Sequence, residues 1–197
     1  MIRFHLFSLL VITFSFAFSQ YNPSVQIPEE VETSTFYLDL SSGINNHTGI
    51  IGIGAMIPID EKFSLRAGAG LGSWGTKLSG GIKYGSRTES GFGFGLGYSH
   101  CPGLDDMDLE YNNGGASVRE FNVDYLQVGT INFTLNYNFV LKNEKIFFLE
   151  TGYAVPTGGS NFYRVNDGGP LSEEEKVLME VLRPGGLILA LGLQVGF

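Results

Sequence analysis

The sequence predicts an all-β fold: an eight-stranded antiparallel up-and-down transmembrane β-barrel with a short helix in the last external loop. Three observations lead to this prediction. Eight segments alternate large apolar residues with small or polar ones, which is the period of a β-strand. The connections between these segments fit a chain that zigzags through a barrel, because both long connections fall at the same end. The amino terminus has the pattern of an export signal.

The amino-terminal segment predicts that the chain is exported. It carries one early basic residue, Arg3, and then an apolar run from Leu6 to Phe18. Together with the small residues that follow, this is typical of a secretory signal peptide cleaved near Ser19/Gln20. The run is shorter than the ~20 residues that a membrane-spanning helix needs. We therefore expect a signal peptide (1–19), a short periplasmic segment (20–33) and an outer-membrane barrel (34–197).

The composition favours strands and turns over helices. The chain has 28 Gly, 16 Phe and 9 Tyr, and only 16% of its residues are charged. Its single cysteine, Cys101, cannot form an internal disulfide, so hydrogen-bonded strands must hold the fold together. The formal net charge of −8 argues against nucleic acid as a partner attracted by bulk charge.

The first four strands are expected in residues 36–41, 51–59, 63–71 and 77–84. In each segment the apolar side chains share one face, and the other face is small or polar. The outward residues are Phe36, Leu38 and Leu40, then Ile51, Ile53, Ala55, Ile57 and Ile59, then Phe63, Leu65, Ala67, Ala69 and Leu71, and then Leu78, Ile82 and Tyr84.

The last four strands are expected in residues 91–98, 131–139, 147–155 and 187–197. The eighth should pair with the first and close the barrel, with Phe197 at the periplasmic rim. The outward residues are Phe92, Phe94, Leu96 and Tyr98, then Ile131, Phe133, Leu135, Tyr137 and Phe139, then Phe147, Leu149, Tyr153 and Val155, and finally Leu187, Leu189, Leu191, Leu193, Val195 and Phe197.

The connections fit a chain that crosses a membrane back and forth. Ten residues at ~3.3 Å each, tilted by ~40°, rise about 25 Å, which is the height of the apolar band of such barrels. Both long links fall on the same side, as in bacterial barrels. We place the turns 58–62, 85–90 and 141–145 in the periplasm, and the links 43–48, 72–75, 100–127 and 156–184 outside.

The apolar face is assigned to lipid rather than to the interior. A soluble lipocalin-like barrel would turn that face inward, but the interior of eight strands is too narrow for so many large side chains. Aromatic residues at both ends of the strands are also typical of a membrane barrel. Those at the external ends are Trp74, Tyr98, Tyr125 and Tyr153, and those at the periplasmic ends are Phe36, Phe63, Tyr84, Phe139, Phe147 and Phe197.

With its signal peptide, eight alternating strands and terminal Phe197, the chain resembles the small outer-membrane β-barrels of Gram-negative bacteria, with the shape of the OmpA and OmpX barrels. The resemblance covers residues 34–197 and is architectural. It implies that the last strand is the signal read by the barrel-assembly machinery, with Phe197, Val195 and Leu193 at the matching alternate positions. It carries no catalytic residue over to this chain.

Four charged residues are predicted to face the lumen at one level: Asp39, Arg66, Lys83 and Glu150. An unpaired buried charge costs several kcal/mol, so we expect these side chains to form a mutual ion-pair network that plugs the barrel. The alternative is a gated proton or ion path. Glycines near Arg66 and Lys83 would make room for these long side chains, or would leave a small cavity for a ligand.

The link 100–127 contains a run of carboxylates: Asp105, Asp106, Asp108 and Glu110. Such a run could bind Ca²⁺ through oxygen ligands, but it lacks the order of an EF-hand loop. A solvated acidic loop is the favoured interpretation, and no metal or cofactor is predicted. Apolar residues alternate again in 121–125, which predicts that the sixth strand extends beyond the membrane and offers an edge for strand addition.

The link 156–184 contains the predicted helix. Ser172 and Glu175 have the spacing of a capping box, and Pro184 ends the helix. We expect an apolar face that packs on the barrel rim, or that docks a partner, made of Val177, Leu178, Val181 and Leu182.

Lipid A modification is the enzymatic alternative, because some eight-stranded barrels carry it out. His47 and His100 are the histidines left after the signal peptide, and neither stands in a known deacylase or palmitoyltransferase motif. The prediction is therefore a non-enzymatic integral outer-membrane protein with a closed lumen, whose long acidic loops serve surface interaction or envelope integrity. Its expected partners are membrane lipid, the barrel-assembly machinery and an extracellular or envelope protein. The alternative is a narrow channel or a barrel that binds a small or lipidic ligand.

Overall fold

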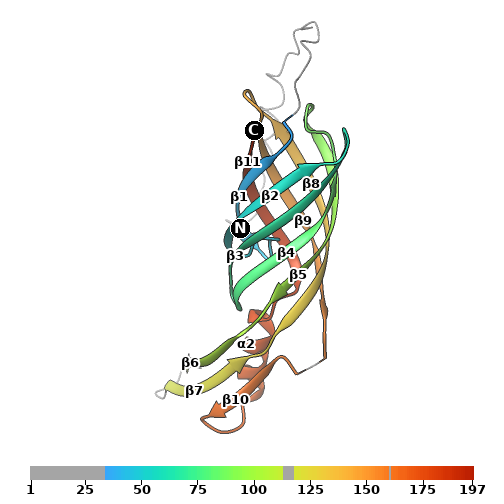
Figure 1. Ribbon diagram of the computed structural model, residues 1–197. Helices are drawn as coiled ribbons and strands as arrows, with labels where there is room; N and C mark the ends of the chain where they lie inside the picture. The colour runs from blue at the N-terminus through green and yellow to red at the C-terminus, as the bar shows by residue number, and fades with distance from the viewer. Residues whose placement is uncertain (1–33, 113–117, 160) are drawn as a thin grey trace, which may run out of the picture. The chain divides into compact units, whose positions relative to one another are not determined.

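The structure is a computed structural model that describes residues 34–112, 118–159 and 161–197. The predicted signal peptide (1–19) and the segment 20–33 lie outside the described residues. Eight strands form a closed antiparallel barrel in the order β1-β11-β9-β8-β5-β4-β3-β2, which confirms the predicted all-β, eight-stranded antiparallel barrel (Figure 1). These strands are β1 (Tyr37–Ile44), β2 (Ile51–Pro58), β3 (Phe63–Gly72), β4 (Gly75–Tyr84), β5 (Gly91–Cys101), β8 (Val128–Val140), β9 (Lys145–Thr157) and β11 (Gly186–Gly196).

The last strand closes the barrel against the first, as predicted. In the antiparallel register of β1 and β11, Leu40 lies opposite Leu193. The pairing continues past the strand ends, because the Phe197 amide donates to the Phe36 carbonyl at 2.9 Å and the Thr35 amide donates to the Phe197 carbonyl at 3.2 Å. Closure leaves the barrel without an open edge.

The barrel wall is apolar outside and polar inside. Leu40, Ile53 and Phe92 are 59%, 65% and 67% exposed, although they are large hydrophobic residues. Asn136 and Glu150, which are polar, are 1% and 3% exposed. Successive side chains of a strand point to opposite faces, so the alternation read from the sequence produces this distribution.

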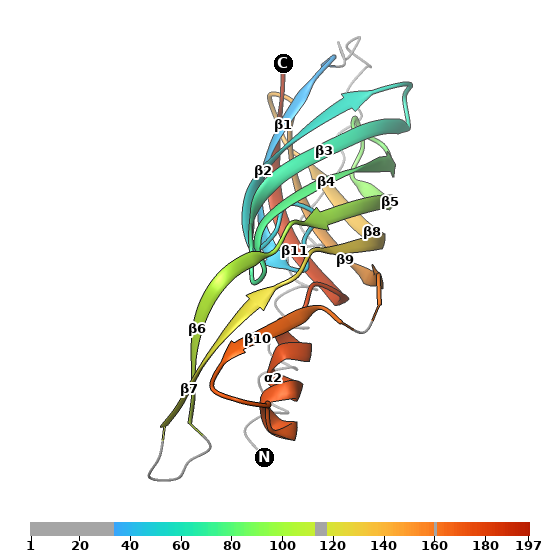
Figure 2. The same ribbon diagram turned by 60° about the horizontal axis from the view of Figure 1, so that its bottom comes forward.

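A second, three-stranded sheet is built from the two long connections, β5–β8 and β9–β11. Its strands are β6 (Leu104–Asn112), β7 (Val118–Tyr125) and β10 (Tyr163–Asp167), in the order β10-β7-β6. The helix α2 (Glu173–Leu182) follows β10. We call these three strands and α2 the end module. Figures 1 and 2 show it at the end of the barrel away from the carboxy terminus.

The expectation that the sixth barrel strand continues through residues 121–125 is wrong. That segment belongs to β7, which pairs with β6 and β10, and β8 begins at Val128. The Leu126 amide donates to the Phe162 carbonyl at 2.9 Å instead of continuing the barrel ladder. Because this break redirects the chain, the long links form a folded module rather than two loops.

The other end of the barrel carries three short turns, at residues 59–62, 85–90 and 141–144, and we call it the short-turn end. In the first turn, Asp60 accepts hydrogen bonds from the backbone amides of Lys62 and Phe63. Short turns and long links therefore lie at opposite ends, as predicted. No helix in the described part of the chain is long and apolar enough to cross a membrane.

Candidate functional site

Arg66 and Glu150 form an ion pair across the barrel interior. Their strands, β3 and β9, are not neighbours in the barrel, so the pair spans the lumen. The Arg66 guanidinium lies 2.8 Å from Glu150 Oε2, and both side chains are almost fully buried. A second guanidinium nitrogen lies 3.4 Å from the hydroxyl of Thr134. The pair thus ties three strands together through the centre of the barrel.

The other two predicted lumen charges have different partners. Lys83 Nζ donates to Asn138 Oδ1 at 3.2 Å and lies 5.0 Å from the centre of the Phe148 ring. Asp39 lies 3.7 Å from His47 Nε2. All four predicted residues are buried in the lumen, but the structure joins only Arg66 and Glu150 directly. Lys83 contacts the Asn138 amide and the Phe148 ring, and Asp39 lies beside His47.

The connection between β1 and β2 folds into the barrel, although the sequence places it outside. Asn46, His47 and Thr48 are 0%, 5% and 0% exposed. Asn46 Nδ2 donates to the hydroxyls of Ser41 and Thr48, both at 2.9 Å. We call these three residues the plug loop. It enters the lumen from the end that carries the end module.

Glycine on neighbouring strands provides the space for this loop. A Cβ at Gly68 would lie 2.8 Å from Thr48 Cγ2 and 3.1 Å from His47 Cδ2. The glycine faces predicted to accommodate long side chains or a ligand therefore receive the plug loop in β3. In β5 the earlier expectation holds, because a Cβ at Gly95 would lie 3.0 Å from the Arg66 guanidinium.

The plug loop is attached to the chain that leaves the end module. Asn45 precedes the loop and has a left-handed backbone conformation, with φ of 50°. Its side-chain amide donates to the Gly185 carbonyl and to the Leu187 carbonyl, the latter at 3.1 Å, and its Oδ1 accepts from the Gly185 amide at 3.2 Å. Lys77 Nζ also donates to the Asn45 carbonyl at 3.3 Å. We call the Asn45–Gly185 contact the latch.

Apolar side chains occupy the lumen at the short-turn end, where the alternation of β1 and β2 predicts that Tyr37 and Met56 point inward. Tyr37, Met56 and Ile146 form a buried cluster, with Val140 packed against it. Arg87 reaches in from the β4–β5 turn and donates to the Ser64 hydroxyl at 3.0 Å. Buried side chains therefore lie in the lumen at this end as well as at the plug loop.

The end module has its own core. Trp74, from the β3–β4 turn, stacks on Tyr125 with ring centres 3.8 Å apart, and its indole N–H donates to the Leu126 carbonyl at 2.8 Å. Trp74 and Tyr125 are 0% and 4% exposed, so their predicted place in an outward aromatic girdle is wrong. Tyr98 and Tyr153 are half exposed, as that prediction requires. Trp74 instead fixes the module to the barrel.

The predicted apolar face of α2 is correct only in part, because Leu182 packs against the module core but the two valines of that face are exposed. Val177 and Val181 are 62% and 76% exposed, whereas Met179 is fully buried. Arg119 of β7 explains the orientation, because its guanidinium lies 2.9 Å from Glu175 Oε2 and turns that side of the helix inward. The predicted capping box is confirmed: the Ser172 hydroxyl accepts from the Glu175 amide, and Glu175 accepts from the Ser172 amide.

Asp124 joins all three strands on the other face of the sheet. It accepts hydrogen bonds from the Asp106 amide of β6 at 3.0 Å and from Arg164 and Asn166 of β10. The Asp106 amide, and then Arg164 and Asn166, stabilise the charged form and lower the pKa of Asp124 to about 2. This carboxylate therefore holds β6 and β10 against β7.

The carboxylate run does not gather into a cation site. Asp105 and Asp106 lie in an irregularity of β6, where Asp106 has a φ of 55°, whereas Asp108 and Glu110 lie in the regularly paired part of the strand. Asp108 accepts a hydrogen bond from Asn122 Nδ2 at 2.8 Å. An extended strand spreads successive carboxylates instead of converging them on one point. Among the described residues, no three His, Cys, Asp or Glu side chains are placed to hold a metal ion.

The strand geometry separates His100 from the side chain of the preceding Ser99. Ser99 is 1% exposed and accepts a hydrogen bond from Asn132 Nδ2 at 2.6 Å, so it faces the lumen. His100 follows it on the same strand and points to the opposite face. Cys101 is buried in the core shared with the end module.

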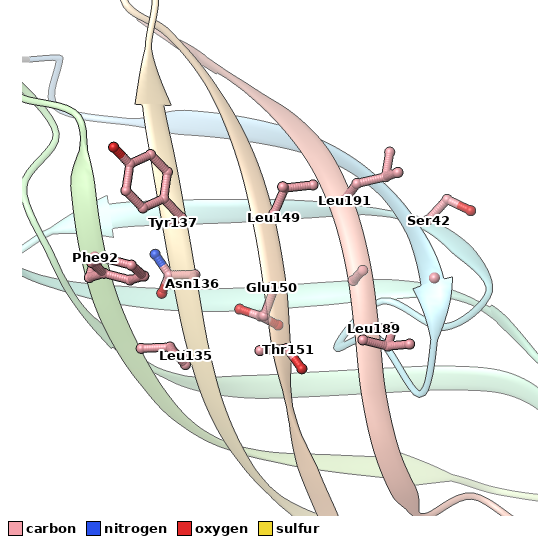
Figure 3. A pocket seen from close by; sticks show the side chains of 12 residues that line it. Ser42, Phe92, Leu135, Asn136, Tyr137, Leu149, Glu150, Thr151, Leu189 and Leu191 are labelled. Atoms are coloured by element: carbon pink, nitrogen blue, oxygen red, sulfur yellow. The ribbon is translucent and has the colours of Figure 1, made fainter. Parts of the chain in front are cut away.

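The outer wall has an open hollow of about 530 Å³. Figure 3 shows the side chains around it, among them Leu135, Tyr137, Leu149 and Leu191. The hollow occurs where the short side chains of Ser42 and Thr151 interrupt the apolar face, and the Ser42 hydroxyl donates to the Ile50 carbonyl at 2.7 Å. Its apolar lining and open shape suit a hydrocarbon chain better than a polar ligand.

No protein-family model matches this chain, and no curated protein is significantly similar to it.

Proposed function

We propose that this protein is a closed, non-enzymatic barrel of the outer membrane of a Gram-negative bacterium, and that it displays the end module at the cell surface for interaction with a partner. The observation that carries the proposal is the distribution of residues in the wall. An exposed apolar face such as that of Phe92, Phe94 and Leu96 is costly in water and is matched by lipid tails.

The proposed orientation follows from the two ends of the barrel. Short turns lie in the periplasm and long links outside in bacterial barrels. With the same orientation here, Phe197 lies at the periplasmic rim, where the barrel-assembly machinery would read the terminal strand. The end module then lies outside the cell, at the end of a folded scaffold.

A closed lumen is the second part of the proposal. The plug loop fills one end, the Arg66–Glu150 pair crosses the middle, and the apolar cluster around Met56 fills the other end. Such an interior supports a structural or display role rather than transport. The hollow over Ser42 and Thr151 would be filled by lipid tails.

Three measurements test this proposal. The protein should remain in the membrane fraction after alkaline carbonate extraction, and it should migrate differently in gels before and after boiling, as folded barrels do. In planar lipid bilayers the wild-type protein should show no steady conductance. Release by carbonate would contradict the membrane assignment, and steady conductance would contradict the closed lumen.

A narrow proton or water path is the second candidate function. It is favoured by two buried acceptors, Glu150 Oε1 and Asn136 Oδ1, which lie opposite each other on β9 and β8 and have no protein donor among the described residues. Buried groups of this kind are usually paired with water. Proton flux into vesicles loaded with a pH-sensitive dye would distinguish this path from a closed lumen.

A further inference from the structure

β6 is an edge strand, and its side chains determine which kind of extended segment can pair with it. β6 ends the sheet order β10-β7-β6, so one side of its backbone has no strand partner within the described sheet. It is also the longest strand of this sheet, with 9 residues against 8 in β7 and 5 in β10. An edge strand presents a row of backbone donors and acceptors that can bind an added strand.

The two faces of β6 differ in kind. Met107, Leu109 and Tyr111 pack against the module core but are only partly buried, whereas the central residues Phe121 and Val123 of β7 are fully buried. The opposite face carries the exposed carboxylates of Asp108 and Glu110. β6 contains no Lys or Arg. An added strand would therefore meet half-covered apolar side chains on one face and acids on the other.

One cross-strand pair favours a cation at this edge. Glu110 of β6 lies directly opposite Glu120 of β7, and both are exposed. Like charges in this position repel each other. A cationic side chain on a strand added beside β6 would reduce that repulsion.

We propose that β6 is the docking site for an extended segment of a partner protein in which Lys or Arg alternates with apolar residues, and that this segment adds to the sheet as a fourth strand. The cations would lie beside Asp108 and Glu110, and the apolar residues beside Met107, Leu109 and Tyr111. The inference rests on the proposed display of the end module and names the chemistry of its partner.

The acids of β6 also select against other occupants. A second copy of the chain would bring one acidic β6 against another, and anionic lipid headgroups would be repelled in the same way. The opposite edge, β10, is a weaker site because it is short and its pairing with β7 is irregular after Val165.

The test uses the full-length mature protein folded in lipid nanodiscs and a synthetic nine-residue peptide in which Lys alternates with Val. The comparison peptide has the same composition with the Lys residues grouped at one end. Isothermal titration should give a dissociation constant at least about tenfold lower for the alternating peptide, because only this peptide can place all its cations on one face. Amide hydrogen exchange in 104–112 should slow when it binds.

Charge-reversal variants locate the interaction. Asp108→Lys with Glu110→Lys should weaken binding of the alternating peptide at least about tenfold, since repulsion replaces attraction. The matched control, Glu61→Lys with Glu89→Lys, makes the same change in net charge at exposed positions of the short-turn end and should bind like the wild type. Asp108→Asn with Glu110→Gln, which adds no new charge, should have an intermediate effect.

Equal binding of the two peptides, unchanged exchange in 104–112, or an equal loss in the control would overturn the docking proposal. Gel mobility before and after boiling verifies that each variant has folded. If the peptide fails to bind to a barrel that is folded, membrane-embedded and non-conducting, the docking proposal fails and the proposed closed barrel stands.

Discussion

Arg66 and Glu150 depend on each other, because each is a charge enclosed by the barrel wall. Their ion pair is worth little beyond the cost of burying two charges, but either residue alone would leave an uncompensated buried charge. Arg66→Met should therefore lower the free energy of unfolding by about 3–5 kcal/mol. Arg66→Met combined with Glu150→Leu should recover much of that loss. Urea unfolding followed by gel mobility checks this, and a double variant no more stable than the single one would contradict it.

The low pKa of Asp124 predicts that the end module resists unfolding by acid. Its pKa of about 2 in the folded protein lies below the ~3.9 of an unfolded aspartate, so its contribution is complete above about pH 4 and is lost as the pH falls toward 2. Trp74 is the only tryptophan and is buried in the module core, so its fluorescence reports module unfolding. Emission should stay blue-shifted at pH 4 and shift to the red near pH 2. In Asp124→Asn, module stability should change much less over this interval.

Among the structural elements, the plug loop points inward and is held by the latch to the chain that leaves the end module. Asn45→Ala removes the side-chain bonds to Gly185 and Leu187 and should free the loop to leave the lumen. We expect conductance events in planar bilayers that the wild type lacks. Asn161→Ala, at an exposed position, is the matched control and should remain closed. A closed Asn45→Ala barrel would mean that the latch is not what holds the loop.

Substitutions on α2 can show which of its faces packs against the module core. Met179→Ala removes a fully buried side chain and should cost about 2–5 kcal/mol of module stability. Val177→Ser with Val181→Ser changes exposed positions and should stay within about 0.5 kcal/mol per site. Denaturation followed by Trp74 fluorescence measures both. A larger loss of stability in the Val177→Ser, Val181→Ser variant than in Met179→Ala would mean that the two valines pack against the core, as the sequence predicts.

At the scale of the whole molecule, barrel closure depends on the pairing of β11 with β1. Phe197 extends that pairing beyond the strand, and we propose that it also marks the strand for assembly. Deletion of Phe197 should reduce the yield of heat-modifiable barrel in membranes, and Phe197→Tyr should restore it. A normal yield after deletion would contradict an assembly role for the terminal aromatic residue.

The strands were predictable because their signal is local. A period of two residues places Leu38 outward and Asp39 inward whatever the rest of the chain does. The capping box of α2 was predictable for the same reason, since Ser172 and Glu175 lie within one turn. The antiparallel order and the closing pair followed from chain continuity and the even number of strands.

The remaining features depend on contacts between distant segments. The inward path of Asn46–Thr48 depends on the space that Gly68 leaves on β3, and glycines facing a polar loop were the signal that could have revealed it. The exposed side of α2 depends on Arg119, more than fifty residues before Glu175. Alternation alone could not separate β7 from β8, because both sides of the break have the same period.

The two-part origin of the end module has a consequence for the order of folding. β6 and β7 form a local hairpin, but β10 reaches the same sheet only after β8 and β9 have been made, and β11 begins directly after α2. Contacts between segments far apart in the chain form slowly. If the barrel is inserted as proposed, the β6–β7 hairpin reaches the outer side of the membrane before the β9–β11 connection, which supplies β10 and α2. Completion of the module and closure of the wall are then nearly the same event, so a chain that displays a finished module has also finished its barrel.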